Sequence, residues 1–228
     1  PHALIREGLV QKLNIPQNDF FFWNSGSDHD LILFLGVEPN LAWPEYCQAI
    51  LDLSRQLQAP RIYSLGGIFD QAPHTRETRI HATVSHPQMK NKFKTFAHFG
   101  NYEGPCSFTT MLLSMGREQG IEVAGISVRT PLYIHDLNSK ACYDLLKNVL
   151  AVAGFQIDMS DLRQASATLV ETVDNAFSEN PTALAQLKKL EQLFDAAIGE
   201  EPLRGPGEDY DKLLEEMRKL KREGRKPH

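Results

Sequence analysis

A short segment, Pro-His-Thr-Arg, brings together three side chains that could bind an anion. An imidazole, a hydroxyl and a guanidinium follow one another at His74, Thr75 and Arg76, and a guanidinium can bind a phosphate or carboxylate through two parallel N–H groups. The segment lies in a predicted loop after a strand, where ligands of open α/β sheets usually bind. An equally weighted alternative is that Arg76 pairs with Glu77, with Glu38 or with a carboxylate of a neighbouring subunit.

A second segment, Gly-Pro-Cys-Ser-Phe-Thr, has the composition of a helix start. Gly104 and the proline after it predict a turn, Ser107 is a good N-cap, and the free N–H groups of a helix start favour an anion. Cys106 lies beside this start, where a thiol can serve as a nucleophile. The alternative, which we favour, is that Ser107 only caps the helix and Cys106 is a small buried apolar residue, because caps greatly outnumber anion sites.

A third segment, Arg-Thr-Pro-Leu-Tyr, follows another predicted strand. Arg129 could bind an anion, and Tyr133 could stack on a ligand or anchor a subunit contact, although ordinary packing is the favoured interpretation of Tyr133. Because the ends of parallel strands share one edge of a sheet, we expect the three segments to meet at one surface cleft. The candidate ligand-binding residues are His74, Thr75, Arg76, Gly104, Ser107, Arg129 and Tyr133.

No residue pattern in the sequence matches an established catalytic motif. The phosphate-binding glycine loops, the nucleophile elbow and the zinc-binding HExxH motif are all missing. Four scattered histidines have no metal-ligand spacing, namely His81, His86, His98 and His135. We therefore assign no catalytic residue, and we expect neither a metal ion nor a cofactor.

The composition is that of an ordinary soluble globular protein. The chain has 228 residues, of which 42% are apolar and 23% charged, and its net charge is −5. A negative net charge argues against a dedicated nucleic-acid-binding protein, and the longest apolar run, Leu31–Val37, is too short to cross a membrane. The 3 cysteines form no CxxC pair, which favours reduced thiols in the cytoplasm. Because the chain starts at Pro1, a truncation before that residue is one expectation.

Alternating strand and helix patterns predict an α/β sheet domain over residues 1–137. Short apolar runs predict strands over 19–24 and 30–37, each buried on both faces. Further strands are predicted over 61–66, 79–85 and 121–129. Helices are predicted after Pro44, after Pro87 and over 107–117. Strands that alternate with helices imply a mostly parallel sheet with helices on both faces.

Residues 138–199 show only helical periodicity and predict a small helical subdomain. We expect no strand within 139–198, because the apolar residues there recur at intervals of three and four. Ser160 and Asn180, each followed by a residue that suits the first turn, predict the starts of two of the helices.

Residues 200–228 predict a linker followed by a charged amphipathic C-terminal helix. They contain 8 acidic and 8 basic residues around an apolar stripe spaced like a coiled-coil seam. The stripe is a candidate partner-binding surface made of Tyr210, Leu213, Met217 and Leu220. Because a short isolated helix is marginal in water, we expect the stripe to dock on a neighbouring subunit or on the chain's own sheet domain.

Several stretches carry a family resemblance in their order and spacing, among them DLILFLGVEPNLAWPEYC, LGGIFDQAPHTRE and YEGPCSFTTMLLSMGREQGIEVAGISVRTPLYI. Over about residues 5–220 the sequence resembles the bacterial branch of the proteasome assembly chaperone 2 family. The resemblance implies a three-layer α/β/α sandwich, similar in topology to purine nucleoside phosphorylases, with a small helical subdomain. It also implies a homo-oligomer, of which a trimer is one form. Members usually begin with a strand, a Gly-rich turn and a helix, which here would lie before Pro1.

Two functional hypotheses follow from these patterns. The first is a non-catalytic, oligomeric protein-binding scaffold that resembles an assembly chaperone. It would bind other copies of itself and a further protein in the cytoplasm, and neither nucleic acid nor membrane. The alternative is an enzyme or binder of a small anionic ligand, such as a nucleoside or phosphate compound, at the strand ends. The missing catalytic motifs and the resemblance favour the first hypothesis.

Overall fold

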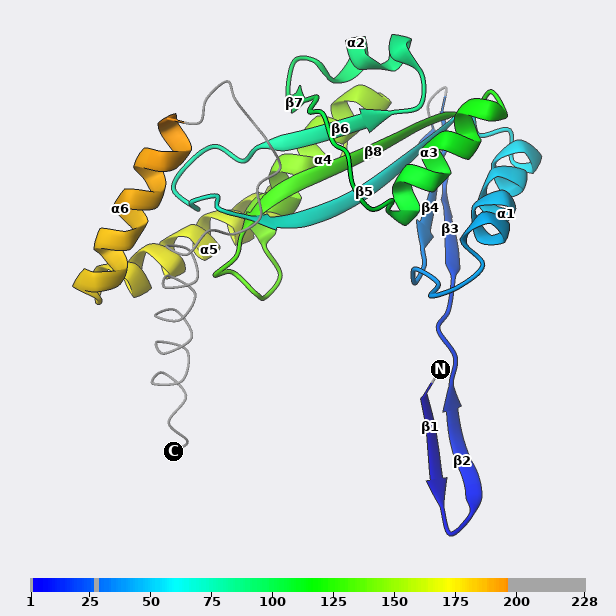
Figure 1. The fold of residues 1–228 in the computed structure, drawn as a ribbon, viewed down its shortest axis with the longest axis horizontal. Coiled ribbons are helices and arrows are strands. Elements are labelled where there is room, and N and C mark those ends of the chain that lie inside the picture. Colours follow the sequence, from blue (N-terminus) through cyan, green and yellow to red (C-terminus); the bar gives the residue numbers. More distant parts are fainter. Residues whose placement is uncertain (1, 27–28, 197–228) are drawn as a thin grey trace. The chain divides into compact units, whose positions relative to one another are not determined.

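A computed structural model describes residues 2–26 and 29–196 of the chain (Figure 1). The contacts between residues divide the chain into two compact units, Pro1–Ile50 and Leu51–His228. The boundary falls inside helix α1 (Trp43–Gln56), which begins one residue before Pro44, close to the predicted start. No helix among the described residues is long and apolar enough to span a membrane.

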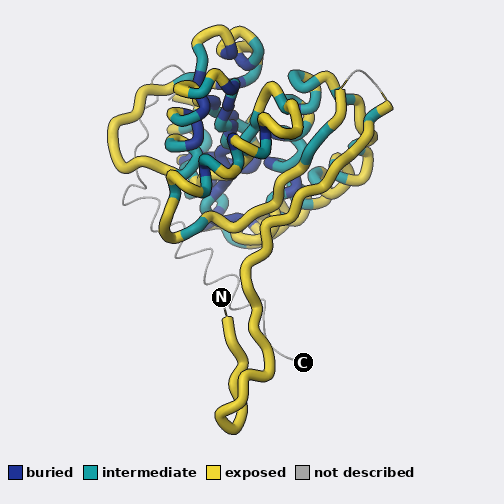
Figure 2. Tube along the Cα trace, turned by 90° about the vertical axis from the view of Figure 1, so that its right-hand side faces the viewer, coloured by how far each residue is buried: buried dark blue, intermediate teal, exposed yellow. Residues whose placement is uncertain are grey.

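The first unit begins with a β-hairpin that the residue patterns did not predict. Strands β1 (His2–Arg6) and β2 (Leu9–Asn14) pair in antiparallel fashion, with an irregularity in register between Leu4 and Ile5. The two residues that connect the strands both have positive φ, which is the geometry of the tight turns that suit hairpins. Every residue of both strands is exposed, and Figure 2 shows the hairpin uncovered along its length.

A second hairpin follows in the same unit. Strands β3 (Asp19–Trp23) and β4 (Leu31–Leu35) form where strands were predicted, and the rings of Phe20 and Phe34 stack across them at a centroid distance of 4.4 Å. The predicted burial on both faces was wrong, because all of β3 is exposed and β4 is only partly buried at its start. A run of apolar residues identifies a strand, whereas its burial depends on the layers that pack against it.

The second unit contains a four-stranded sheet in the order β5-β8-β6-β7. Strand β5 (Arg61–Asp70) runs parallel to β8 (Glu122–Pro131) over their whole length, and the register pairs Asp70 with Pro131. Strand β6 (Ile80–Val84) runs antiparallel to β8 and parallel to the short β7 (Ala97–His98). The fold is therefore α/β with a mostly parallel sheet, as predicted.

One face of β8 carries the main core of the second unit. Ala124, Ile126 and Val128 are buried and belong to one apolar cluster with the inner side of α4 (Ser139–Ala153). The cluster also includes Phe93 of the short α2 (Lys90–Phe93), which follows the 3₁₀ turn η1 (Pro87–Met89). Figure 2 shows these buried segments in dark blue.

The opposite face of β8 is covered by α3 (Phe108–Glu118). Two glycines allow the close approach: a Cβ atom at Gly125 would lie 2.6 Å from Thr109, and one at Gly116 would lie 2.4 Å from Val123. Helices α3 and α4 thus lie on opposite faces of the sheet (Figure 1), which confirms the prediction of helices on both faces.

Three helices follow β8 and are called here the helical subdomain: α4, which also packs on the sheet, α5 (Ser160–Ser178) and α6 (Pro181–Ala196). Asn180 caps α6 by accepting two backbone N–H groups, as its position before a proline predicts. Over the described residues 139–196 there is no strand, as predicted. The predicted C-terminal helix and its stripe, Tyr210, Leu213, Met217 and Leu220, lie outside the described residues.

Candidate functional site

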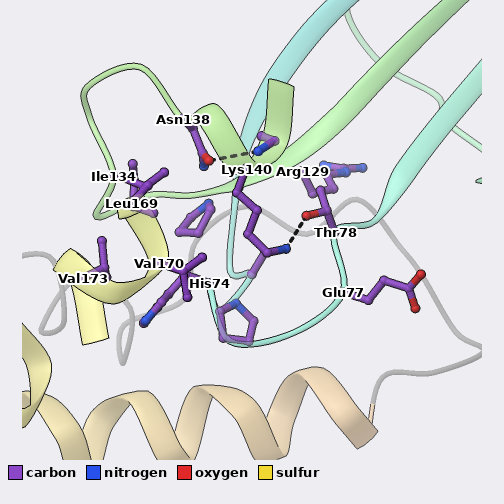
Figure 3. Close-up of a pocket in the computed structure, with 14 residues that line it drawn as sticks. His74, Glu77, Thr78, Arg129, Ile134, Asn138, Lys140, Leu169, Val170 and Val173 are labelled. Atoms are coloured by element: carbon purple, nitrogen blue, oxygen red, sulfur yellow. Dashed lines mark hydrogen bonds between the residues drawn. The ribbon is translucent and has the colours of Figure 1, made fainter. Parts of the chain in front are cut away.

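The strand ends of the second unit lead into a small cavity between the sheet and the helices α4 and α5 (Figure 3). The loop after β5 and the loop after β8 start side by side, because Asp70 pairs with Pro131 in the parallel register. The first turn of α4 and the inner side of α5 complete the walls. The cavity has a volume of about 10 Å³, and its polar lining consists of His74, Glu77, Thr78, Arg129, Asn138 and Lys140.

His74 is the most buried of these polar side chains and is held from three sides. Its ring nitrogens lie 2.7 Å from the Tyr133 hydroxyl through Nδ1 and 3.0 Å from Asp174 through Nε2. Its backbone N–H also donates to the Tyr133 hydroxyl at 2.8 Å. The ring of Phe177 stacks on the imidazole at a centroid distance of 5.4 Å. His74 therefore connects the loop after β5 to the loop after β8 and to α5.

These hydrogen bonds assign one tautomer to His74. The ionised carboxylate of Asp174 can only accept a hydrogen bond, so in the neutral imidazole Nε2 carries the ring hydrogen and donates it to Asp174. Nδ1 then accepts the hydroxyl hydrogen of Tyr133, whose oxygen also accepts the backbone N–H of His74. Burial lowers the pKa of His74, and the hydrogen bond to Asp174 opposes part of that lowering. The imidazole is neutral at pH 7 in this arrangement.

The chain Asp174–His74–Tyr133 has the connectivity of a catalytic relay but the wrong orientation for catalysis. In such a relay the carboxylate is buried and the nucleophile faces the substrate. Here the side chain of Asp174 is 52% exposed, whereas Tyr133 is only 6% exposed and its hydroxyl is engaged with His74. The arrangement supports a role in holding the two loops and α5 together.

The burial of His74 predicts a pH dependence of stability. An unfolded histidine binds a proton near pH ~6.5, whereas the folded His74 has a lower pKa. As the pH falls from 7.5 through this range the unfolded state gains the proton first, so the free energy of unfolding should decrease. Urea unfolding at several pH values measures this slope. His74→Gln should flatten this slope, and a slope equal to that of the unchanged chain would contradict the assignment.

Thr75 and Arg76 contact α6 instead of facing the cavity. Arg76 donates to both oxygens of Asp195 at 2.9–3.2 Å and to Glu191 at 3.1 Å. Thr75 donates its hydroxyl hydrogen to Glu191. The hydrogen bond from Arg76 lowers the pKa of Asp195, and the same bond raises the pKa of Arg76. Neither of the partners suggested by the sequence, Glu77 and Glu38, is the observed one.

A neighbouring arginine strengthens this contact with α6. Arg79 donates to the carbonyl of Phe194 at 2.7 Å, and its guanidinium lies 3.6 Å from the centre of the Phe194 ring. The last turn of α6 is thus held to the loop after β5 largely by polar and cation–π contacts.

Removal of Arg76 should therefore loosen the end of α6. In Arg76→Ala, we expect amide hydrogens of residues 190–196 to exchange several-fold faster, with no change in α4. The melting temperature should fall by less than about 3 °C, because exposed ion pairs contribute little. Hydrogen–deuterium exchange checks this. Arg55→Ala, which removes a surface pair with Asp52, is the matched control, and equal exchange of α6 in both variants would contradict the assignment.

Arg129 and Lys140 are the two cations of the cavity wall. Arg129 is 6% exposed, and its Nη1 lies 3.6 Å from Asp70. Lys140 donates to the carbonyl of Arg76 at 3.0 Å, to Thr78 at 2.7 Å and to Asp144 at 3.3 Å. Figure 3 shows the Lys140 side chain reaching Thr78. Lys140 thereby links the start of α4 to the loop after β5.

The segment around Ser107 does not line this cavity. Ser107 caps α3 by accepting the backbone N–H of Thr110, which is the interpretation that the sequence favoured. Cys106 is exposed, so the expectation of a small buried residue there was wrong. Gly104 lies against the ring of Tyr102, whose hydroxyl donates to the carbonyl of Pro105. Of the predicted ligand-binding residues, His74, Arg129 and Tyr133 are brought together, and Gly104 and Ser107 are not among the residues around them.

None of the partners on the two outer helices was predicted, namely Asp174, Phe177, Glu191 and Asp195. Lys140 of α4 was not predicted either. A signal was present for Phe177, because a large aromatic residue near the end of a mostly polar helix calls for burial. The carboxylates gave none, since acidic residues on helix surfaces are common. No group of described side chains has the makeup of a metal site.

Comparisons with known proteins place this fold in a family. The sequence model of the PAC2 family matches residues 1–177. A proteasome-assembly chaperone homologue of Mycobacterium tuberculosis is 25% identical, with a TM-score of 0.69; the match covers 79% of this chain and 76% of that one. A comparison with curated protein sequences returned no match.

Two further solved structures share the fold. A PAC2 family protein of Streptomyces avermitilis has a TM-score of 0.66 at 22% identity, over 77% of this chain and 74% of that one. PbaB of Pyrococcus furiosus, an archaeal proteasome activator, has a TM-score of 0.59 at 22% identity, over 76% of each chain.

Proposed function

Because the chain belongs to the PAC2 family, we propose that it is a non-catalytic, homo-oligomeric scaffold that binds another protein in the manner of an assembly chaperone. The likeness to a proteasome-assembly chaperone homologue at 25% identity supports a chaperone-like role. The protein would act in the cytoplasm, where the three cysteines, none of which forms a disulfide, would stay reduced.

This proposal rests on one observation: the polar residues that follow the strands already have hydrogen-bond partners within the chain. Both ring nitrogens of His74 are hydrogen-bonded, to Tyr133 and Asp174, and the guanidinium of Arg76 is hydrogen-bonded to two carboxylates of α6. Residues that would recognise a substrate are instead occupied in joining the sheet to the helical subdomain. Such an arrangement favours a protein whose surfaces, and not its strand-end cavity, perform the function.

The alternative, a binder of a small anionic ligand at the strand ends, has less support. It rests on the topology and on a buried cation, Arg129, next to a cavity. The cavity, at about 10 Å³, has room for one water molecule and not for a phosphate or a nucleoside. A ligand of that kind would require the helical subdomain to move.

The oligomeric part of the proposal is tested by light scattering on two forms of the chain. We expect the full chain to have a molar mass that is a whole multiple, greater than one, of 25.7 kDa. A form that lacks residues 203–228, and with them the stripe Tyr210–Leu220, should have a smaller mass or a lower melting temperature. A monomeric full chain would contradict the oligomer, and an unchanged mass and melting temperature would contradict the role of the stripe.

The protein-binding part is tested by affinity capture from a native lysate after crosslinking. The full chain should retain subunits of a multi-subunit complex, identified by mass spectrometry, and a denatured sample of the same chain should not. Capture of the chain alone, together with a saturable response to a nucleoside or phosphate compound, would favour the alternative.

A further inference from the structure

A buried guanidinium group borders the strand-end cavity with one N–H still available. Arg129 is 94% buried, and among the described residues its Nε has no hydrogen-bond acceptor. The other end of the group faces Asp70, with 3.6 Å between Nη1 and the carboxylate. Leaving a buried N–H of a charged group without an acceptor is costly, so native proteins supply one from the chain or from bound solvent.

The volume of the cavity limits what that acceptor can be. About 10 Å³ is the space that a single water-sized molecule needs, and a carboxylate, a phosphate or a nucleoside is far larger. The acceptor must therefore be a monatomic ion or a molecule with a single non-hydrogen atom, such as water.

The polar lining offers a further partner for such a molecule. The hydroxyl of Thr78 accepts a hydrogen bond from Lys140, so its own hydrogen remains to be donated. A water molecule that accepts from both Arg129 and Thr78 makes two hydrogen bonds, within the roughly two to four that a buried water usually makes.

The charges around the cavity favour a neutral molecule over an anion. Arg129 lies beside Asp70, and Lys140 lies 3.3 Å from Asp144, so each cation of the wall already has a carboxylate nearby. A halide ion would add a negative charge to a balanced set, whereas a water molecule adds none.

We propose that this cavity binds one ordered water molecule that accepts the Nε–H of Arg129 and links the end of β8 to the loop after β5. The water would add to the hydrogen bonds by which His74 and Arg76 already join the loop after β5 to the helical subdomain. Arg129 is thus a positioning residue for this junction.

A crystal structure of the full chain at a resolution that shows waters tests the proposal. Crystals are grown without halide, and a second set is soaked in bromide. We expect a peak at roughly 2.7–3.2 Å from Arg129 Nε in the first set and no anomalous bromide signal at that position in the second. A bromide signal there, a protein acceptor on Nε, or an empty cavity would each overturn the proposal.

A pair of lysine variants keeps the test independent of folding failure. Arg129→Lys retains the charge near Asp70 and removes the Nε–H; it should lose the water peak and lower the melting temperature by roughly 2–8 °C. Arg61→Lys, in which the lost Nε–H contacts Glu122 at the surface, should retain the water and shift the melting temperature less. A peak that persists unchanged in Arg129→Lys would overturn the assignment.

Discussion

Replacing Phe177 with alanine is expected to lower the free energy of unfolding by about 3–5 kcal/mol, the usual cost of removing a buried aromatic ring. Phe177 is 1% exposed and is the centre of the junction between sheet and helical subdomain. Its ring stacks on His74 and meets Tyr133 edge-on at a centroid distance of 5.2 Å. A cavity left there would separate α5 and α6 from both strand-end loops.

Urea unfolding followed by circular dichroism measures the effect of Phe177→Ala. Phe69→Ala is the matched control, because Phe69 belongs to the same unit and is 54% exposed; its loss should cost much less. A change below about 1 kcal/mol for Phe177→Ala would show that the helical subdomain does not depend on this junction.

Replacing Tyr133 with phenylalanine is expected to cost about 2–4 kcal/mol, although the ring remains and one oxygen atom is lost. The hydroxyl accepts the backbone N–H of His74 and donates to its Nδ1, so its removal leaves two buried polar atoms without a partner. The loss of an exposed tyrosine hydroxyl has no such consequence, because water replaces it.

Tyr102→Phe is the control for Tyr133→Phe. Tyr102 is 62% exposed, and its hydroxyl donates to the carbonyl of Pro105. Thermal unfolding should show a clear decrease in melting temperature for Tyr133→Phe and almost none for Tyr102→Phe. Equal melting temperatures would mean that the hydrogen bonds of His74 do not stabilise the junction.

The strands and helices were largely predictable because their signals are local. Short apolar runs identified β3 and β4, further strand patterns identified β5, β6 and β8, and helical periodicity identified the whole of the region from α4 to α6. The end of β5 was not predictable in this way. Gly66-Gly67 resembles a stop signal, but the strand continues to Asp70 because its neighbour β8 pairs with it residue by residue.

The N-terminal unit shows a different limit of sequence analysis. The β1–β2 hairpin escaped prediction because its strands are short and mix charged with apolar residues. For β3 and β4 the apolar pattern was recognised, but burial is a property of the surrounding layers. Local composition cannot supply that information.

Only part of the candidate site was predictable, because local sequence identifies residues after strands and not their distant partners. Residue type and position after a strand singled out His74, Arg129 and Tyr133, which do come together. Their partners lie about 100 residues further along the chain, as in the contact of His74 with Asp174. An acidic residue on a helix surface looks the same in sequence whether it meets solvent or a buried histidine, so the structural use of these polar residues was visible only in three dimensions.

The central claim is that the polar residues after β5 and β8 hold the helical subdomain on the sheet and do not form a ligand site. The most direct measurement is the melting temperature of the full chain with nucleosides, nucleotides and inorganic phosphate at millimolar concentration. We predict no concentration-dependent change. A ligand present at one hundred times its Kd would raise the melting temperature by roughly 5–10 °C. A saturable rise of that size, lost in Arg129→Lys, would contradict the claim.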